Sequence, residues 1–213
     1  MAGASAAVAT PSRREPRVLL ALALAALVAS GIAPAERGTW WLEVFPVVVG
    51  VPLLVATWRS FPLTPLAYRL LFLHSLVLVV GGHYTYARVP LGFWAQDALD
   101  LARNPYDRLG HFAQGFVPAI LARELLLRTS PLKRGKWLFA LVTMSALAIS
   151  AAYELFEWWA ALVGGEAAES FLGTQGDPWD TQWDMFLALV GAVASQLLLS
   201  REHDRELARM GVA

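Results

Sequence analysis

The 213-residue sequence contains no cysteine, and only 16% of its residues are charged. The absence of cysteine excludes disulfides, thiolate metal ligands and cysteine nucleophiles. Soluble domains carry roughly 25% charged residues, so the low share of charge argues against a water-exposed surface over much of the chain. The formal net charge is zero, which gives no electrostatic basis for a nucleic-acid partner. The sequence also has no internal repeat and no glycine motif of the kind that binds nucleotide cofactors.

Hydrophobic residues make up 57% of the chain. A soluble fold of this size could not bury so much apolar surface, so lipid must be the solvent for much of it. Six apolar runs reach or approach the roughly 17–25 residues that a membrane-spanning helix needs. They cover about residues 17–33, 40–58, 65–83, 109–127, 137–163 and 184–200. The sequence therefore predicts an all-α, polytopic membrane helix bundle of about six transmembrane helices, with the lipid bilayer as its partner.

We expect one transmembrane helical domain over residues 17–200, with a disordered N-terminal tail at 1–16 and a charged C-terminal tail at 201–213. A polar loop is expected at 84–108. The first apolar run has an alternative interpretation as a cleaved signal peptide, because arginines precede it and Ala-Pro-Ala follows it. Pro34 fits a cleavage site badly, and the topology of the remaining chain is the same in both cases.

The distribution of lysine and arginine predicts the orientation, because cytoplasmic loops are enriched in both residues. With the N-terminus inside, thirteen of these residues fall on the cytoplasmic side and four on the other. The loop at 164–183 is then purely acidic and lies outside. We therefore expect a multi-pass protein of the bacterial cytoplasmic membrane with both termini in the cytoplasm.

In this topology the third to sixth helices bring their ionisable residues to the same extracytoplasmic face. Asp107 and His111 are four residues apart and share one helical face. His111 and Gln114 are three residues apart and also share a face. Glu154 lies about nine residues from its helix end, a depth of roughly 14 Å at 1.5 Å per residue. A carboxylate at that depth costs several kcal/mol unless it is paired, neutral or metal-bound, so it must face the bundle interior.

The residues selected for chemistry offer only nitrogen and oxygen donors, which suit Zn, Mn, Fe or Mg. A divalent metal is therefore a possible cofactor. The candidates for catalysis are Asp107, His111, Glu154 and Glu157. The candidates for metal ligation are His83, His111, Glu154, Asp180 and Asp184.

Each candidate also has a structural interpretation. The two glutamates could pair with Arg108 or His111, and His111 could be a hydrogen-bonded structural histidine. His83 could anchor the chain at the membrane interface, and Asp184 could cap a helix.

Four further ionisable residues were given no place in the site. The sequence favours a helix–helix hydrogen bond for His74, interfacial positions for Glu43 and Glu124, and a solvated tail for His203.

The motifs that carry these residues form an ordered series. They read GGHYTYARVPLG from Gly81, NPYDRLGHFAQG from Asn104, YELFEW from Tyr153 and FLGTQGDPWDTQWDM from Phe171. The series closely resembles the YjdF-type inner-membrane family of bacteria over roughly residues 40–200. That resemblance implies a multi-pass membrane protein and supplies no reaction.

A more distant resemblance links the chain to the VanZ-like membrane proteins. The shared order is Asp and His four residues apart, then a pair of acidic or amide residues, then Asp before a glycine-bearing helix. The corresponding residues here are Asp107 with His111, Glu154 with Glu157, and Asp184 with Gly191. The chain departs from that pattern with Arg108 in place of lysine and Glu157 near the position of glutamine.

Three functions remain open on the sequence alone. The first is a membrane enzyme, with or without a metal, acting on a lipid-linked or amphipathic substrate at the outer face. The second is a small transporter or other ligand-binding membrane protein, although the polar residues gather at one face rather than at the midplane. The third is a structural polar network, with the function carried by an unknown protein partner.

Overall fold

The computed structural model describes residues 14–164 and 169–212. In these ranges every regular element is helical and no strand occurs, which confirms the predicted all-α class. The predicted N-terminal tail falls almost entirely outside the described residues, as does Glu166 of the acidic loop. The elements are α1 (Arg14–Ser30), α2 (Arg37–Thr57), α3 (Pro65–Tyr84), the short 3-10 helix η1 (Tyr86–Arg88), α4 (Pro90–Ala98), α5 (Tyr106–Thr129), α6 (Lys136–Gly164), α7 (Glu169–Leu172) and α8 (Asp180–Met210).

Local sequence signals explain several helix ends. Thr64 caps α3 by accepting a hydrogen bond from the Ala67 amide, and Pro65 occupies the first helical position, where its missing N–H costs nothing. Gly211 ends α8 in the left-handed conformation that glycine adopts without strain. The expected polar loop at 84–108 is wrong in part, because it contains η1 and α4.

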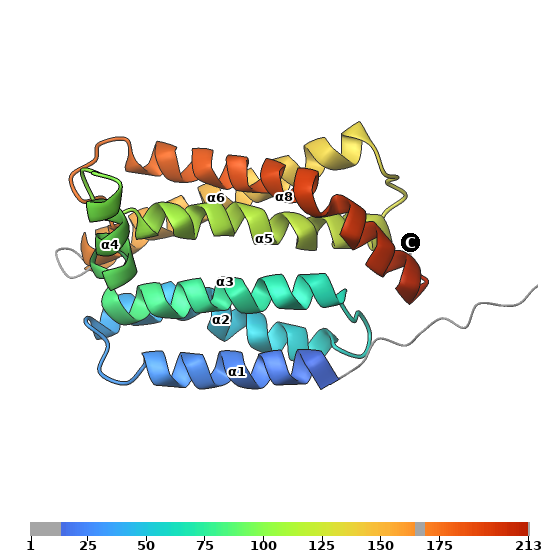
Figure 1. The fold of residues 1–213 in the computed structure, drawn as a ribbon, viewed down its shortest axis with the longest axis horizontal. Coiled ribbons are helices and arrows are strands. Elements are labelled where there is room, and N and C mark those ends of the chain that lie inside the picture. The colour runs from blue at the N-terminus through green and yellow to red at the C-terminus, as the bar shows by residue number, and fades with distance from the viewer. Residues whose placement is uncertain (1–13, 165–168, 213) are drawn as a thin grey trace, which may run out of the picture.

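The long helices form two layers that run side by side (Figure 1). α1, α2 and α3 make one layer, and α5, α6 and α8 make the other; α3 packs on α5 between them. α4 lies across one end of the bundle, which we call the α4 end. Both ends of the described chain lie at the opposite end, which we call the terminal end.

Glycines set the closest contact in the bundle, between α5 and α8. A β-carbon at Gly115 would overlap the backbone of Ala188, and one at Gly191 would overlap the carbonyl of Phe112. Small residues at such positions let two membrane helices approach backbone to backbone. Polar side chains on the same faces of α5 and α8 are therefore forced into contact one or two turns further along.

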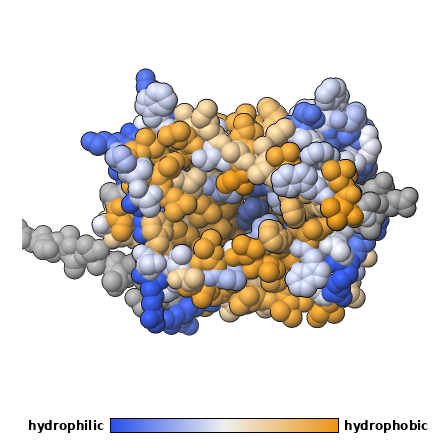
Figure 2. Space-filling view, turned by 180° about the vertical axis from the view of Figure 1, so that it is seen from behind, coloured by the Kyte–Doolittle hydropathy of each residue, from blue (hydrophilic) through white to orange (hydrophobic). Residues whose placement is uncertain are grey.

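Among the described residues, four helices, α2, α3, α6 and α8, are long and apolar enough to cross a membrane. The expected number of about six spans is therefore not confirmed, because four helices satisfy these limits on length and composition. α1 has 17 residues, and α5 has 24 residues but no stretch that is both long and apolar enough to satisfy these limits. Figure 2 shows a broad hydrophobic zone across the middle of one face, with hydrophilic residues gathered at both ends. This distribution is typical of a protein embedded in a bilayer.

The first helix is an integral part of the bundle. α1 packs on α3, and the indole N–H of Trp40 donates a hydrogen bond to Ser30 Oγ at 3.0 Å. Arg69 of α3 forms an ion pair with Glu15 near the start of α1. These contacts favour a retained helix over a cleaved signal peptide.

Candidate functional site

The centre of the candidate site is His111 on α5, close to the α4 end. Its Nε2 atom lies 3.4 Å from Asp107 Oδ1 and 3.8 Å from Asp184 Oδ2. Its Nδ1 atom lies 3.0 Å from Gln114 Oε1 and 3.6 Å from Glu154 Oε1. The two ring nitrogens therefore face different partners. Two aspartates lie on the Nε2 side, and an amide and a glutamate lie on the Nδ1 side.

The three residues on the Nε2 side form a compact donor set. One ligand atom each from Asp107, His111 and Asp184 lies within 4.8 Å of the other two, and all three residues are buried. Asp107 and His111 share a face because they are one helical turn apart on α5. Asp184 comes from α8, and it reaches them because the glycine contact at Gly115 and Gly191 holds these two helices together.

α6 supplies the predicted pair of glutamates. Glu154 and Glu157 are each 8% exposed, and Glu157 lies close enough to Glu154 and His111 to interact with both electrostatically. They therefore join the cluster around His111. Their alternative interpretation is pairing with Arg108 or His111. Glu154 lies 3.6 Å from His111 Nδ1, whereas Arg108 faces Asp177 at 3.4 Å.

Three of the predicted metal ligands lie outside this donor set: Glu154 on the Nδ1 side of His111, Asp180 and His83. Asp180 forms an ion pair with Arg103, which also lies 3.6 Å from Asp107. Asp180 thus belongs to a charged rim at the start of α8. His83 lies further away, with its Nδ1 atom 2.9 Å from the carbonyl oxygen of Ser30 on α1. This contact ties the end of α3 to the end of α1.

Sequence reasoning missed Glu43 and Arg103. Glu43 on α2 is 5% exposed rather than interfacial, and it interacts electrostatically with Asp107 and His111. The available signal was the same as for Glu154, namely a carboxylate inside an apolar run at the same membrane face. Arg103, whose side chain is 10% exposed, is the counter-ion of the rim. No periodic pattern in the sequence predicts the position of Arg103, because this residue precedes α5 in a non-helical segment.

Several buried oxygen atoms of this cluster have no hydrogen-bond partner among the described residues. They are Asp107 Oδ2, Glu154 Oε1, Asp184 Oδ1 and the Tyr153 hydroxyl. Buried polar atoms in folded proteins are nearly always hydrogen-bonded, so orphaned atoms in one place point to a ligand. Carboxylates without donors are the type of group that a cation satisfies.

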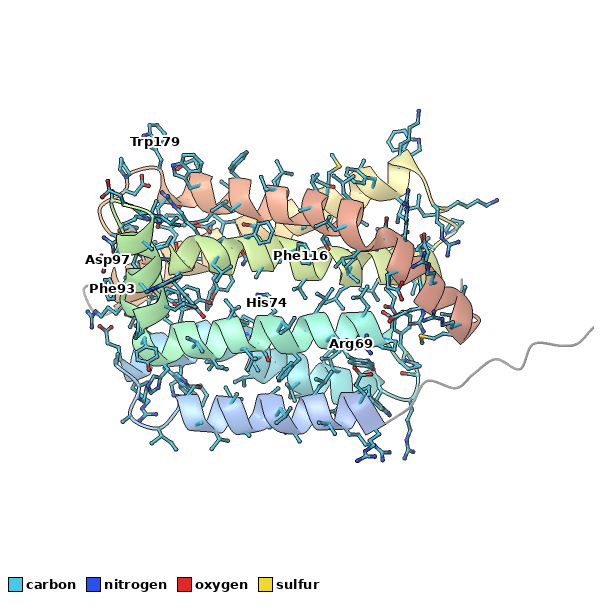
Figure 3. All side chains as sticks on the ribbon, in the orientation of Figure 1. Arg69, His74, Phe93, Asp97, Phe116 and Trp179 are labelled. Carbon is cyan, nitrogen blue, oxygen red and sulfur yellow. The ribbon has the colours of Figure 1, made fainter. Side chains whose placement is uncertain are left out.

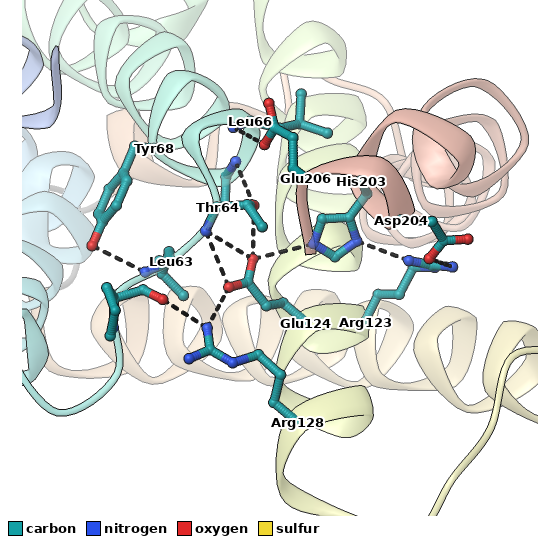
Figure 4. Close-up of polar contacts among 12 residues, drawn as sticks. Leu63, Thr64, Leu66, Tyr68, Arg123, Glu124, Arg128, His203, Asp204 and Glu206 are labelled. Carbon is teal, nitrogen blue, oxygen red and sulfur yellow. Dashed lines mark hydrogen bonds and ion pairs between the residues drawn. The ribbon is translucent and has the colours of Figure 1, made fainter. Parts of the chain in front are cut away.

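A second polar cluster, at the terminal end, has the opposite character (Figure 4). Glu124 on α5 is fully buried and accepts hydrogen bonds from the Thr64 amide and hydroxyl, from Arg128 and from His203 Nε2. Arg123 bridges His203 Nδ1 at 2.9 Å and Asp204 at 2.8 Å. Each of these described side chains has its polar partners, so we interpret this cluster as structural.

This second cluster corrects two expectations from the sequence. His203, assigned to a solvated tail, is completely buried. Glu124, assigned to the interface, is completely buried as well. The physical reason is that α8 continues to Met210 as one helix, and its last turns pack over the α3 N-terminus, where Glu206 accepts a hydrogen bond from the Leu66 amide at 2.8 Å.

A cleft of about 610 Å³ leads away from the site along the bundle interior. Glu43, Asp107, His111 and Glu157 line one end of it, and the remainder is mostly apolar. His74 on α3 also lines this cleft, and Figure 3 shows it in the space between α3 and α5. The expected helix–helix hydrogen bond of His74 is wrong, because its Nε2 atom is buried without a partner among the described residues.

Comparison with known proteins gives a family and no chemistry. Residues 15–205 match the family described as "Predicted membrane protein (DUF2238)". The chain is 56% identical over 186 residues to the inner membrane protein YjdF of Escherichia coli (strain K12), which covers 87% of this chain and 89% of the relative. No solved structure matches. The predicted YjdF-type resemblance is confirmed, the VanZ-like one stays a prediction, and the chain belongs to the DUF2238 family of predicted membrane proteins.

Proposed function

We propose that this inner-membrane protein is an enzyme that binds a divalent cation at Asp107, His111 and Asp184 and acts on the polar part of an amphipathic, lipid-linked substrate. The observation that carries the proposal is the buried donor set, with three ligand atoms within 4.8 Å of one another. Two carboxylates and a neutral imidazole balance the charge of a divalent ion. Three protein ligands with a free position are typical of catalytic rather than structural zinc sites.

The orientation of His111 supports the same interpretation. Metal-bound histidines usually donate their second N–H to a carboxylate or carbonyl, which fixes the ring and its tautomer. His111 directs Nε2 at the two aspartates, and Gln114 Oε1 lies 3.0 Å from Nδ1 as the matching acceptor. Glu154 lies 3.6 Å from the same nitrogen and strengthens this side.

The remaining acidic residues supply the other parts of a reaction site. A bound divalent cation would polarise a substrate oxygen or lower the pKa of a water molecule. Glu157 lines the cleft beside His111 and is the group positioned to take up or deliver a proton. Glu43 completes the acidic wall on the α2 side. The orientation inferred from the lysine and arginine distribution would put this chemistry at the extracytoplasmic face.

The test is the metal content of protein purified in mild detergent, loaded with Zn²⁺ or Mn²⁺ and freed of excess metal. We expect close to one metal per chain for the wild type and a loss of most of it in Asp107→Asn and Asp184→Asn. Asp97→Asn is the matched control, because Asp97 is an exposed aspartate on α4 at the same end of the bundle (Figure 3). Equal metal content in all four proteins, or none in the wild type, would refute the metal site.

A transporter is the second candidate, and His74 is the observation in its favour. An intramembrane histidine without a partner can relay a proton. Proton-coupled flux through purified protein in liposomes, lost in His74→Leu and kept in Asp97→Asn, would establish this alternative over the enzyme.

A further inference from the structure

The cleft opens to the side of the bundle, between α2 and α6. α2 packs on α3, whereas α6 packs on α5 and α8, so the two helices face each other across the opening. Three apolar residues at the cleft, Phe45, Val49 and Ile149, are between 45% and 50% exposed. Figure 2, which looks at this side of the molecule, shows a hollow near the middle of the hydrophobic zone. A bilayer around the protein would therefore meet this opening with its hydrocarbon chains.

The walls of the cleft change character along its length. The end near the α4 end carries the acidic residues and His111 of the candidate site. The stacked rings of Phe45 and Phe156, with centroids 5.7 Å apart, bridge α2 and α6 close to that end. Beyond them the wall is formed mainly by aliphatic side chains, among them Val47, Val51 and Leu78.

A second cavity of about 440 Å³ continues the first one toward the terminal end. The two share the wall residues Val51, Leu54, Leu71 and Ser75. Along α2, the distance from Glu43 to Leu54 is about 16 Å at 1.5 Å per residue, so the combined cavities extend beyond half of a hydrocarbon core of roughly 30 Å.

The character of these walls decides what fills them. Apolar cavities do not hold water well, because a water molecule needs several polar partners. An empty cavity of this size loses the dispersion contacts of all its lining atoms. The surrounding bilayer offers hydrocarbon chains at high concentration, and such chains match the aliphatic walls. A head group attached to such a chain would then meet the polar end.

We propose that the two cavities bind the hydrocarbon chain of a membrane lipid, which enters sideways between α2 and α6 with its head group against Glu43, His111 and Glu157. This inference rests on the proposed function, because it takes the lipid to be the substrate of the proposed enzyme and its head group to be the part that reacts. It assigns the substrate class as a lipid whose chain reaches at least to the middle of the bilayer.

The test is native mass spectrometry of the metal-free full-length protein released from mild detergent. We expect the wild type to retain one lipid, and its mass will distinguish a phospholipid from a lipid-linked sugar or polyprenyl compound. Gly50→Trp should lower the retained fraction at least fivefold, because Gly50 lines the cleft and a β-carbon there meets no atom within 4 Å. Ala152→Trp, on the α6 side of the opening, should act in the same way.

The matched control is Leu53→Trp, which adds the same ring three residues from Gly50 on a side chain that is 61% exposed and does not line the cleft. It should retain lipid like the wild type. No retained lipid in the wild type, or equal retention in Gly50→Trp and Leu53→Trp, would overturn the proposal. This assay contains no metal. A failure to retain lipid would therefore leave the proposed metal site untouched, and a failure to bind metal would leave the proposed lipid site untouched.

Discussion

The contact between α5 and α8 offers a sharp test, because a single methyl group should disturb both stability and the site. The β-carbon that Gly115→Ala adds would overlap three atoms of Ala188, namely its carbonyl oxygen, its carbonyl carbon and its Cα. All three atoms belong to the backbone, so no side-chain rotation can relieve the overlap and the helices must separate. Overpacking of this kind costs about 1–3 kcal/mol.

Whether Gly115→Ala raises or lowers stability is informative, because the higher helix propensity of alanine would raise it and the steric overlap would lower it. Alanine is favoured over glycine by about 1 kcal/mol in a helix interior. Gly50→Ala provides the control, since Gly50 is in α2 and its new β-carbon would meet nothing within 4 Å. We expect Gly50→Ala to stabilise the protein slightly and Gly115→Ala to be about 1–3 kcal/mol less stable than that control.

Two measurements check this prediction. Unfolding in mixed detergent micelles, followed by far-UV circular dichroism, gives the difference in stability between Gly115→Ala and Gly50→Ala. The metal content of the same samples reports on the site, because separation of α5 from α8 moves Asp184 away from His111. If Gly115→Ala is as stable as Gly50→Ala and binds metal equally well, the glycine contact does not assemble the site and the reasoning fails.

Three other predictions follow from single contacts. Gln114→Leu should leave stability unchanged but weaken Zn²⁺ binding about 10–100-fold in a competition titration, because the His111 ring loses its orienting acceptor; unchanged affinity would contradict that role. Glu124→Leu should lower the free energy of unfolding in detergent by about 3–5 kcal/mol, because it leaves the buried side chains of Arg128 and His203 without their acceptor. Arg205→Ala is the control: it breaks only an exposed ion pair and should lower the free energy of unfolding by less than about 1 kcal/mol. Asp97→Cys should react with a membrane-impermeant maleimide in intact cells and Lys133→Cys only after permeabilisation; the reverse pattern would invert the proposed orientation.

The features of the fold that depend on local periodicity were predictable from the sequence. The apolar runs located the long helices, because each run is bounded by polar or turn-forming residues. Asp107 and His111 were paired correctly because four residues bring two side chains to one face of a helix. His74 and His83 both belong to α3, where His83 contacts the Ser30 carbonyl oxygen of α1 and His74 lines the cleft.

The features that depend on contacts between distant segments were not predictable. Glu43 and Glu157 are both carboxylates within apolar runs, and only the packing of distant helices shows that both line the cleft. His203 was misplaced because a charged segment after an apolar run reads as a solvated extension. In the structure Glu124 and Arg123 of α5 compensate the charge there, so a polar helix end becomes buried.

The two polar clusters, one at each end of the bundle, differ in how completely their buried charges are compensated. At the terminal end, Glu124 and His203 bury their charge inside a complete set of hydrogen bonds, which fixes the register of α3, α5 and α8. At the α4 end, Asp107 and Asp184 are buried with oxygen atoms that have no donor among the described residues. Arg103 lies 3.6 Å from Asp107 and compensates part of this charge. Asp184 Oδ1 has neither a donor nor an arginine among its described partners, so packing alone does not account for it. A site of this kind can persist because the satisfied cluster and the glycine contact hold its helices in place, leaving the acidic oxygens available to a ligand.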